Sequence, residues 1–547
     1  MRVWHTASVM SGAVAAPEGA DPGGPRGGTR SQPTAAPVAA VDIGTNSFHL
    51  VVAQPTGGQR FEVIDREKSM VRLGSGSGDM KRLEPEAIER GIVALKRFRQ
   101  IAESAGATLH AVATSAVREA ENRDEFLRRA RTEAGVEVDV ISGAEEARLI
   151  HVGVLQGVAG LDRRHLLVDI GGGSTEFVIG EGHQVLEAVS LKLGAIRLTE
   201  RFLRREPLRK KDVAECRRYV RAYLTHPVRR AGTLGFDVAV GSSGTIASLA
   251  EMVNAQRGGE ALKTVSSFTF TGDELTSVVA ALVKAPTVAD RLKLPGLDGK
   301  RADIILGGAI VLEQAFAELG IEEMTVSDHA LREGVLLDDL RRRDRVSFGH
   351  LDDLRRASVL HLAAICPGEA VHAEHSTGLA LALFEATRVR HGLGDECEEW
   401  LEAAGLLANV GLFVSHDRHH LHSYYVIRNS DLLVGFTDRE VEIIAQVARY
   451  HRKSAPKNRH EEFARLSEED QATVRTLAGI LRVAIALDRT HAGLVEKVSV
   501  AGGAGDDELE VVVASGGREI DLELYTAEAR KGLLEDALSV SVHFTAT

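Results

Sequence analysis

Residues 166–179, LLVDIGGGSTEFVI, decide how the chain is organised. An apolar run predicts a buried strand, a turn of small residues follows, and a second β-rich run returns from it. The three consecutive glycines allow backbone conformations that side chains forbid, and they let a ligand approach the N–H groups of the turn. Those N–H groups, together with the hydroxyls of Ser174 and Thr175, suit phosphate oxygens. Asp169, at the end of its strand, is placed to hold a divalent cation or its water shell.

An ordinary glycine-rich hairpin would also fit these glycines, but an earlier copy of the pattern favours phosphate binding. Residues 39–52, AAVDIGTNSFHLVV, follow the same plan of strand, Asp-Ile-Gly, small polar turn and strand. The two aspartates, Asp42 and Asp169, stand far enough apart for each to open its own domain. A repeated phosphate hairpin predicts two facing α/β halves with a charged ligand between them.

The composition is that of a globular protein with several domains. The chain has 547 residues, of which 44% are hydrophobic and 26% charged, so more than one core is expected. Aromatic residues make up only 4%, which argues against a nucleic-acid partner bound by base stacking. The net charge of −12 means that a polyanion must be met by a local basic surface or by metal ions.

The cysteines and the apolar runs indicate the compartment. Cys216, Cys366 and Cys397 are isolated, without the paired spacing of a zinc site or a disulfide framework. No run approaches the roughly 18 apolar residues of a membrane span. Residues 1–37 are rich in Gly, Pro, Ala and Ser, which predicts a disordered tail rather than a secretory signal. These observations predict a cytoplasmic protein with no membrane partner.

Both halves alternate strands with helices. In the first half the pattern βββαβαβα predicts an α/β sheet, with strands at 61–68, 108–113 and 136–141 and a helix at 84–104. The second half repeats the order, with strands at 165–170, 176–179, 184–191, 237–240 and 324–327 and a helix at 302–319. The strand at 237–240 ends in GSSGT, another strand-to-helix turn rich in N–H and hydroxyl groups.

One helix start carries two adjacent glutamates with different expected roles. Ser142 and Glu145 have the spacing of a capping box, which predicts a local structural role for Glu145. Glu146 has no capping role and is therefore the better candidate of the two for a catalytic carboxylate. The alternative is a solvated first-turn glutamate that interacts favourably with the helix dipole.

Residues 201–230 hold the strongest positive charge, with eleven Lys and Arg against three Asp and Glu. Such a run is either a solvated helix face or a surface that guides a polyanion.

From about residue 345 the chain changes to long amphipathic helices, which predicts a helical domain. His416, His419, His420 and His422 suggest a metal site, although loop histidines are more often exposed or hydrogen-bonded. Beyond residue 495 the β-rich character returns. This predicts a small closing α/β unit with strands at 497–500, 508–513, 520–524 and 540–544 and a helix at 527–538.

Together these residues resemble the exopolyphosphatase / guanosine pentaphosphate phosphohydrolase (Ppx/GppA) family in its long, four-domain form. The resemblance extends from about residue 38 to Asp488. Its main motifs are VDIGTNSFH at 41–49, ATSAVR at 113–118, ISGAEEARLI at 141–150 and VDIGGGSTE at 168–176. It implies two actin-like (ribonuclease H-like) α/β domains at 38–150 and 151–340, an HD-like helical domain at 345–495 and a small α/β domain at 496–547.

The resemblance also implies the chemistry, which is hydrolysis of terminal phosphates with Mg²⁺ or Mn²⁺. Glu146 would be the general base, because a base must reach the attacking water, and Arg118 a catalytic phosphate ligand. The expected metal or water organisers are Asp42, Asp169 and Glu176. The expected phosphate-binding residues are Asn46, Ser47, Gly171, Gly172, Gly173, Ser174, Thr175, Ser243, Gly244 and Thr245.

The helical domain departs from the HD signature. A metal-binding member would read Leu-Leu-His-Asp-Ile-Gly where this chain reads LLANVG at 406–411. Ala408 cannot ligate a metal, and Asn409 is a neutral, weak ligand. We therefore expect a structural, dimerising or substrate-holding role there, and a homodimer.

Several functions compete at this stage. The first is an exopolyphosphatase acting on inorganic polyphosphate, and its nearest rival is a guanosine pentaphosphate (pppGpp) phosphohydrolase working with the same machinery. An actin-fold kinase would need an acceptor pocket and nucleotide contacts that the sequence does not reveal. A non-catalytic alarmone or polyphosphate sensor is opposed by the intact Glu146 and by both Asp-Ile-Gly hairpins.

Overall fold

The computed structural model describes residues 36–57, 60–76, 80–158, 161–343, 349–366, 369–430, 432–501 and 507–547. The expectation of a disordered tail at 1–37 falls almost wholly outside these residues. In the described part the strands form three sheets, of five, six and three strands. No helix within these ranges combines the length and the apolar character needed to cross a membrane.

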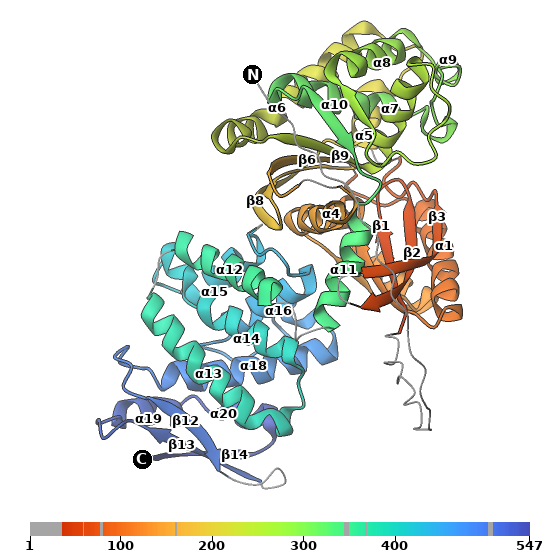
Figure 1. The fold of residues 1–547 in the computed structure, drawn as a ribbon. Helices are drawn as coiled ribbons and strands as arrows, with labels where there is room; N and C mark the ends of the chain where they lie inside the picture. Colours follow the sequence, from red (N-terminus) through yellow and green to blue (C-terminus); the bar gives the residue numbers. More distant parts are fainter. Residues whose placement is uncertain are drawn as a thin grey trace, which may run out of the picture. The chain divides into compact units, whose positions relative to one another are not determined.

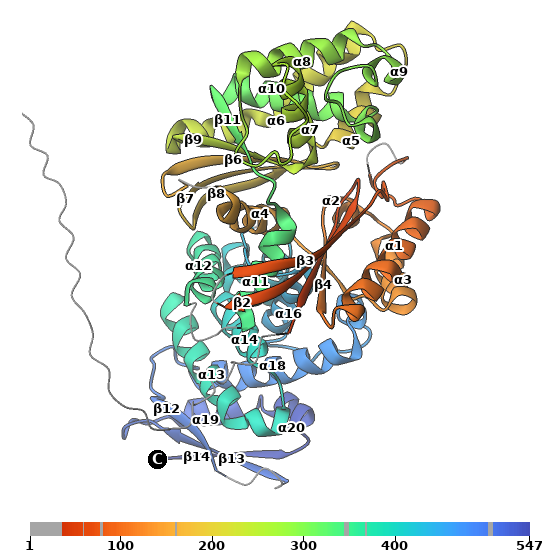
Figure 2. The ribbon, with the colours of Figure 1, turned by 45° about the vertical axis from the view of Figure 1, so that its right-hand side comes forward.

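The first sheet is covered by helices on both faces, and its central strand, β1, is buried. Its strand order is β3-β2-β1-β4-β5, antiparallel from β1 to β3 and parallel from β1 to β5. Ala39, Val41 and Ile43 of β1 pack toward α1, whereas Val38 and Ala40 share a core with α4 and α11, so helices cover both faces (Figure 2). The elements are β1 (Val38–Ile43), β2 (Phe48–Gly57), β3 (Arg60–Ser69), α1 (Pro85–Ser104), β4 (Thr108–Ala113), α2 (Ser115–Glu119), α3 (Arg123–Arg129), β5 (Val138–Val140), α4 (Gly143–Gly157) and α11 (Leu331–Arg343).

The second sheet repeats this topology. Its order is β8-β7-β6-β9-β11-β10, so its first five strands match the first sheet in order and direction. The predicted duplication of an α/β unit is therefore confirmed. The elements are β6 (Arg164–Ile170), β7 (Thr175–Glu181), β8 (Gln184–Leu191), α5 (Ala195–Leu198), α6 (Lys210–Leu234), β9 (Val238–Ser242), α7 (Ser243–Gln256), β10 (Thr269–Thr271), α8 (Gly272–Lys284), α10 (Ile305–Leu319) and β11 (Glu323–Val326).

Helices α4 and α11 pack tightly against each other and belong to one core with strands of both sheets. Their contact needs glycine, because a Cβ atom at Gly334 would lie 1.9 Å from the Leu149 carbonyl oxygen. Helix α11 also packs on β1 and β2 (Figure 1). The boundary expected between residues 150 and 151 falls inside α4, and α11, expected in the second domain, lies on the first sheet. The division into four domains otherwise stays a prediction.

The capping box expected at the start of α4 is only half formed. Ser142 Oγ accepts a hydrogen bond from the Glu145 N–H at 3.1 Å, but the Glu145 carboxylate does not return to Ser142. It accepts instead from Arg148 Nη2 at 2.6 Å and from the Gly435 N–H at 2.7 Å. Arg148 Nη2 also bonds Asp338 at 2.8 Å. Glu145 is thus structural, as expected, but it joins distant segments in a buried ion-pair network.

The remaining helices and the third sheet share a single core. The expected boundary at 495/496 therefore does not separate two cores. The segment at 520–524, expected to be a strand, is helical from Asp521 on. Leu522 is half exposed, whereas Glu523 is buried and accepts the hydroxyl of Thr490, so the alternation of apolar residues did not indicate a strand here. The elements are α12 (Gly349–Ile365), α13 (Ala370–His391), α14 (Asp395–Leu407), α15 (His419–Arg428), α16 (Asp438–Arg449), α18 (Glu468–Ala486), β12 (Lys497–Ala501), β13 (Glu508–Ala514), α19 (Asp521–Glu528), α20 (Gly532–Leu538) and β14 (Ser541–Ala546).

Candidate active site

The turns of the two repeated hairpins lie against each other, as expected from the duplicated pattern. A Cβ atom at Gly172 would lie 3.1 Å from Thr45 Cβ, and one at Gly173 would lie 2.7 Å from Thr45 Oγ1 and 2.6 Å from Ser115 Oγ. A Cβ atom at Gly194 would lie 2.1 Å from the Gly172 carbonyl oxygen. The glycines are therefore required by the close approach of the two turns.

A cavity of about 420 Å³ lies between these turns and the turn at 243–245. Twelve of the fifteen predicted site residues line it: Asp42, Asn46, Ser47, Glu146, Asp169, Gly171, Gly172, Gly173, Ser174, Ser243, Gly244 and Thr245. Both atoms of the Asn46 side-chain amide are buried and have no hydrogen-bond partner among the described residues. Since such groups are costly to leave unpaired, the amide is set up to bind a ligand.

Four buried carboxylates gather beside this cavity. Burial, together with the negative charge of Glu146, raises the pKa of Asp42 to about 7. The same two causes raise the pKa of Asp169 to about 7. Burial also raises the pKa of Glu146 and holds that of Glu176 well above its ordinary value. Acidic groups so close together in a desolvated place need protons or a cation.

Arg118 connects Glu146 to a second cavity. Its Nη1 atom donates to Glu146 Oε2 and to the Ile141 carbonyl oxygen, both at 2.9 Å. Burial outweighs this arginine in its effect on the pKa of Glu146, which stays raised. Arg118 does not line the first cavity but lies in the wall of another, of about 690 Å³. That wall also includes Lys81, Glu119, Glu121, Lys192, Arg197, Arg201, Tyr219 and Tyr223.

Two of the expected site residues lie behind the cavity surface. Thr175 is fully buried at the start of β7, and its hydroxyl donates to the Leu193 carbonyl oxygen. Its hydroxyl therefore holds the turn in place, and a phosphate-binding role for this residue stays a prediction. Glu176 is also buried and accepts from Ser190 Oγ at 2.7 Å, so it acts on the site through its closeness to Glu146 and Asp169.

Two arginines of the cavity were not among the predicted residues. Arg332, at the start of α11, donates to Glu333 at 3.0 Å, and its charge opposes the rise in the pKa of Asp42 and Asp169. Arg301 packs on the turn at Gly244, where a Cβ atom would lie 1.8 Å from Arg301 Nη2. Burial lowers the pKa of Arg301, and among the described residues its guanidinium makes no hydrogen bond. Arg332 stands in a recognisable LREG motif, whereas Arg301 belongs to no local pattern.

Another cavity, of about 1180 Å³, lies elsewhere and has a different character. It is lined by α12, α14 and α16, and its arginines are paired: Arg355 with Glu440 of the lining and Arg439 with Asp470 outside it, both at 2.6 Å. With its cations already paired, it is a poor candidate for an anionic ligand.

Two α/β sheets of one topology, whose hairpin turns face each other across a cavity of carboxylates and arginines, define a protein that acts on phosphate groups. Comparison with known proteins agrees with this class. Residues 51–343 match the Ppx/GppA phosphatase family, and residues 354–524 match domain III of the Ppx/GppA phosphatases. The chain belongs to the Ppx/GppA phosphatase family and is a phosphoanhydride hydrolase.

Solved structures resemble just over half of the chain. An exopolyphosphatase from Cytophaga hutchinsonii is 32% identical, with a TM-score of 0.53, and the match covers 56% of this chain and 98% of that one. An exopolyphosphatase-like protein is 30% identical, with a TM-score of 0.53 and the same coverage. The Ppx/GppA family member from Aquifex aeolicus is 28% identical, with a TM-score of 0.49, and the match covers 56% of this chain and 99% of that one.

We expect that Gly173→Ala lowers kcat/KM for phosphate release about 10²-fold, because the added methyl group meets Thr45 and Ser115 and separates the turns. Gly232→Ala is the matched control, since a Cβ atom at Gly232 meets nothing within 4 Å. Steady-state kinetics and circular dichroism of both variants test this. Wild-type kcat/KM in Gly173→Ala would show that the close approach of the turns has no catalytic importance.

Proposed function

We propose that the protein is an exopolyphosphatase that removes the terminal phosphate of inorganic polyphosphate with the help of Mg²⁺ or Mn²⁺. The observation that carries the proposal is Glu146, a buried carboxylate with a raised pKa in the cavity between the two turns. A general base works best when its pKa lies near the working pH. The similarity to an exopolyphosphatase supports the choice of substrate.

The donor set fits a hard divalent cation. Asp42 and Asp169 present carboxylate oxygens to the cavity, and Mg²⁺ prefers oxygen ligands and commonly uses one or two carboxylates. The raised pKa of each shows that the local negative charge is not offset by the side chains present. We propose that these two residues hold the ion and that Glu176, behind them, adds negative charge. A bound Mg²⁺ neutralises charge on the phosphoryl oxygens.

The chain's own residues supply the remaining steps. Glu146 accepts the proton of the attacking water, while Arg118 fixes the Glu146 carboxylate and offers positive charge to the terminal phosphate. The Asn46 amide, unpaired among the described residues, donates to a phosphate oxygen. Arg301 and Arg332 reduce the repulsion between the substrate and the carboxylates, because charge-assisted contacts to phosphate are the strong ones.

Guanosine pentaphosphate is the second candidate substrate, because the chemistry at its terminal phosphate is the same. The second cavity favours the longer polyanion. Lys81, Lys192 and Arg201 line it together with Arg118, with Lys192 paired to Glu119 at 2.8 Å, and we propose that phosphates behind the terminal one lie along these cations. A non-catalytic sensor would not need a general base, and the raised pKa of Glu146 is that of such a base.

Phosphate release by the purified protein, from long-chain polyphosphate and from guanosine pentaphosphate side by side with Mg²⁺, tests the proposal. We expect a higher kcat/KM for polyphosphate, and release about 10²–10⁴-fold slower from either substrate in a Glu146→Gln control. A higher kcat/KM for guanosine pentaphosphate would reverse the order of the two functions. Binding of both without release would favour the sensor.

The basic run at 201–230 contributes to the second cavity through few of its members. Arg201 donates to Tyr219 Oη at 3.0 Å in the cavity wall, whereas Arg217 is paired with Glu313 at 2.7 Å. We expect Arg201→Ala to raise KM for long polyphosphate several-fold and to flatten its salt dependence, since one neutralised charge is lost. Guanosine pentaphosphate should be little affected.

Arg218→Ala is the matched control for this prediction, because Arg218 is exposed in the same run but does not line the cavity. The measurement is KM against ionic strength for both substrates. The same change in both variants, or none in Arg201→Ala, would identify the run as an ordinary solvated face.

We propose that the helical part is an HD-like domain without catalysis of its own. Ala408, directly after α14, has a side chain that cannot bind a metal. We also propose a cytoplasmic homodimer. The exposed apolar side chains of Phe413, Val414 and Tyr425 support the association, and the free, buried cysteines support the compartment.

A further inference from the structure

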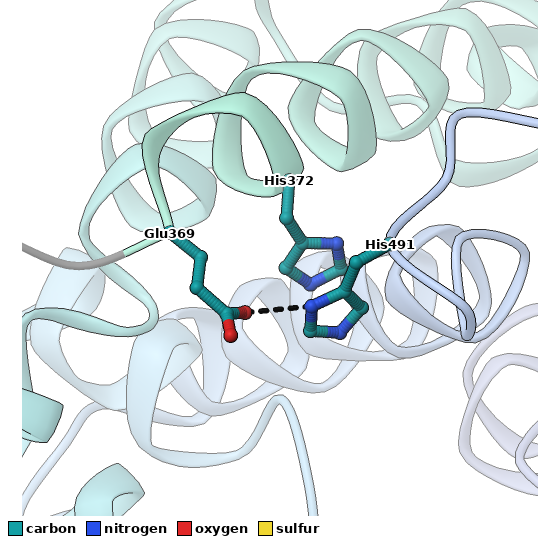
Figure 3. A group of neighbouring side chains, drawn as sticks. All are labelled: Glu369, His372 and His491. Carbon is teal, nitrogen blue, oxygen red and sulfur yellow. Dashed lines mark ion pairs between the residues drawn. The ribbon is translucent and has the colours of Figure 1, made fainter.

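The histidines that suggested a metal site in the sequence do not form one among the described residues. The side chains in direct contact with His419 are His451, at 3.4 Å, and Arg452, at 3.3 Å, and neither is a carboxylate. Metal-ligating side chains gather elsewhere. Glu369, His372 and His491 bring three ligand atoms within 4.8 Å of one another. Figure 3 shows the two imidazole rings and the carboxylate turned toward each other.

Two segments distant in the sequence build this cluster. Glu369 directly precedes α13, and His372 lies in the first turn of this helix. The two side chains therefore lie close together at the start of the helix. His491 lies in the connection between α18 and β12. The cluster therefore joins the start of one helix to the segment that leads into the third sheet.

His372 is held in the orientation of a metal ligand. Its Nδ1 atom bonds Asp488 Oδ2 at 2.6 Å, and both side chains are buried. The other oxygen of Asp488 accepts the Gly493 N–H at 3.0 Å, which fixes the carboxylate. A histidine whose one ring nitrogen donates to a carboxylate offers the other nitrogen as a ligand, the usual arrangement in metalloproteins. Nε2 of His372 is therefore left as the ligand atom.

The backbone at His491 is also held in an uncommon conformation. Its φ is 56°, in the left-handed region that favours glycine. The neighbouring Thr490 is fastened by Glu523, which accepts its hydroxyl at 2.6 Å and its N–H at 3.2 Å. Strained backbone of this kind persists where the surrounding structure imposes it, often at binding sites.

In this structure the three side chains contact one another directly. Glu369 Oε2 lies 2.7 Å from His491 Nδ1, and the rings of His372 and His491 stack at 3.7 Å with an angle of 10°. An ion lies in the plane of each ring that binds it, so one ring must turn. His491 and Glu369 can move, because their side chains are 38% and 52% exposed.

We propose that Glu369, His372 and His491 bind one divalent transition-metal ion, with Zn²⁺ as the best match, and that Asp488 orients His372. Two imidazoles and a carboxylate are ligands that zinc accepts, with a fourth position for water. Mg²⁺ prefers oxygen ligands alone, so this site differs in kind from the carboxylates of the phosphatase cavity. The ion would tie the start of α13 to the connection at 488–495.

Zinc titration of the full-length protein, freed of metal by dialysis against a chelator, tests this inference independently of the proposed function. The amount bound is read by competition with a chromogenic chelator and by elemental analysis. The variants are Glu369→Gln and His491→Ala, both at exposed positions. The control is His543→Ala, an exposed histidine of β14 outside the cluster.

We expect the wild type and His543→Ala to bind one more equivalent of Zn²⁺ than either cluster variant. Comparing the wild type with the cluster variants subtracts any zinc bound in the phosphatase cavity, which all of these proteins share. Zn²⁺ should also raise Tm more in the wild type and in His543→Ala than in the cluster variants, because an ion that binds only the folded state stabilises it. Equal zinc content in the wild type and both cluster variants would overturn the proposal.

Discussion

Replacing Glu146 by Gln is expected to lower kcat by about 10²–10⁴-fold, the usual contribution of a general base. The amide keeps the size of the side chain and its contact with Arg118, which lies 2.9 Å away, so the fold and substrate binding should persist. The measurement is kcat and KM for phosphate release with saturating Mg²⁺. KM should change little, because Glu146 is expected to act on the water and not on the bound phosphates.

Glu145→Gln is the matched control, since it makes the same change at the preceding residue. Glu145 is buried and paired with Arg148 at 2.6 Å, so we expect a loss on the order of 1–3 kcal/mol in the free energy of unfolding. The kcat of the folded protein should remain near the wild-type value. Similar losses of kcat in both variants would show that Glu146 is no more catalytic than its neighbour.

The metal-free protein is expected to lose stability as the pH rises from about 4 to about 8. Burial raises the pKa of Asp42 and of Asp169 to about 7 from the ordinary 3.8. Between these values the folded state binds more protons than the unfolded state, so the free energy of unfolding falls with rising pH. A shift of this size corresponds to on the order of 4 kcal/mol for each carboxylate. The contribution is complete below pH 3.8 and lost above about pH 7.

Thermal unfolding with a chelator and with Mg²⁺, across this pH range, checks the prediction. Mg²⁺ should raise Tm most at pH 8, where both carboxylates are ionised and repel each other. Asp42→Asn should flatten the pH dependence in the chelator and weaken the effect of Mg²⁺. The exposed Asp65 provides the control Asp65→Asn, which should behave as the wild type. A Tm that rises with pH in metal-free protein would contradict the assignment of these groups.

Much of the fold follows from local pattern. The two Asp-Ile-Gly hairpins predicted two similar sheets, and the sheets do share one strand order. The reason is that the pattern of apolar residues in a strand and the residue types of a turn depend on a few neighbouring positions, which the sequence shows directly. The hairpins also predicted two facing turns, and the close approach of Gly172 and Gly173 to Thr45 confirms that the turns meet. The role of Glu146 as a base remains a prediction.

Only the tertiary structure decided the interactions between distant segments. Glu145 satisfies the local spacing of a capping box, yet the buried Arg148 is a stronger partner for its carboxylate than the Ser142 N–H. Arg301 reaches the cavity from a segment without a motif. His372 and His491 stack on each other although more than a hundred residues separate them in the sequence. The free energy that sets such contacts comes from burial and charge in the folded chain, which short stretches of sequence do not record.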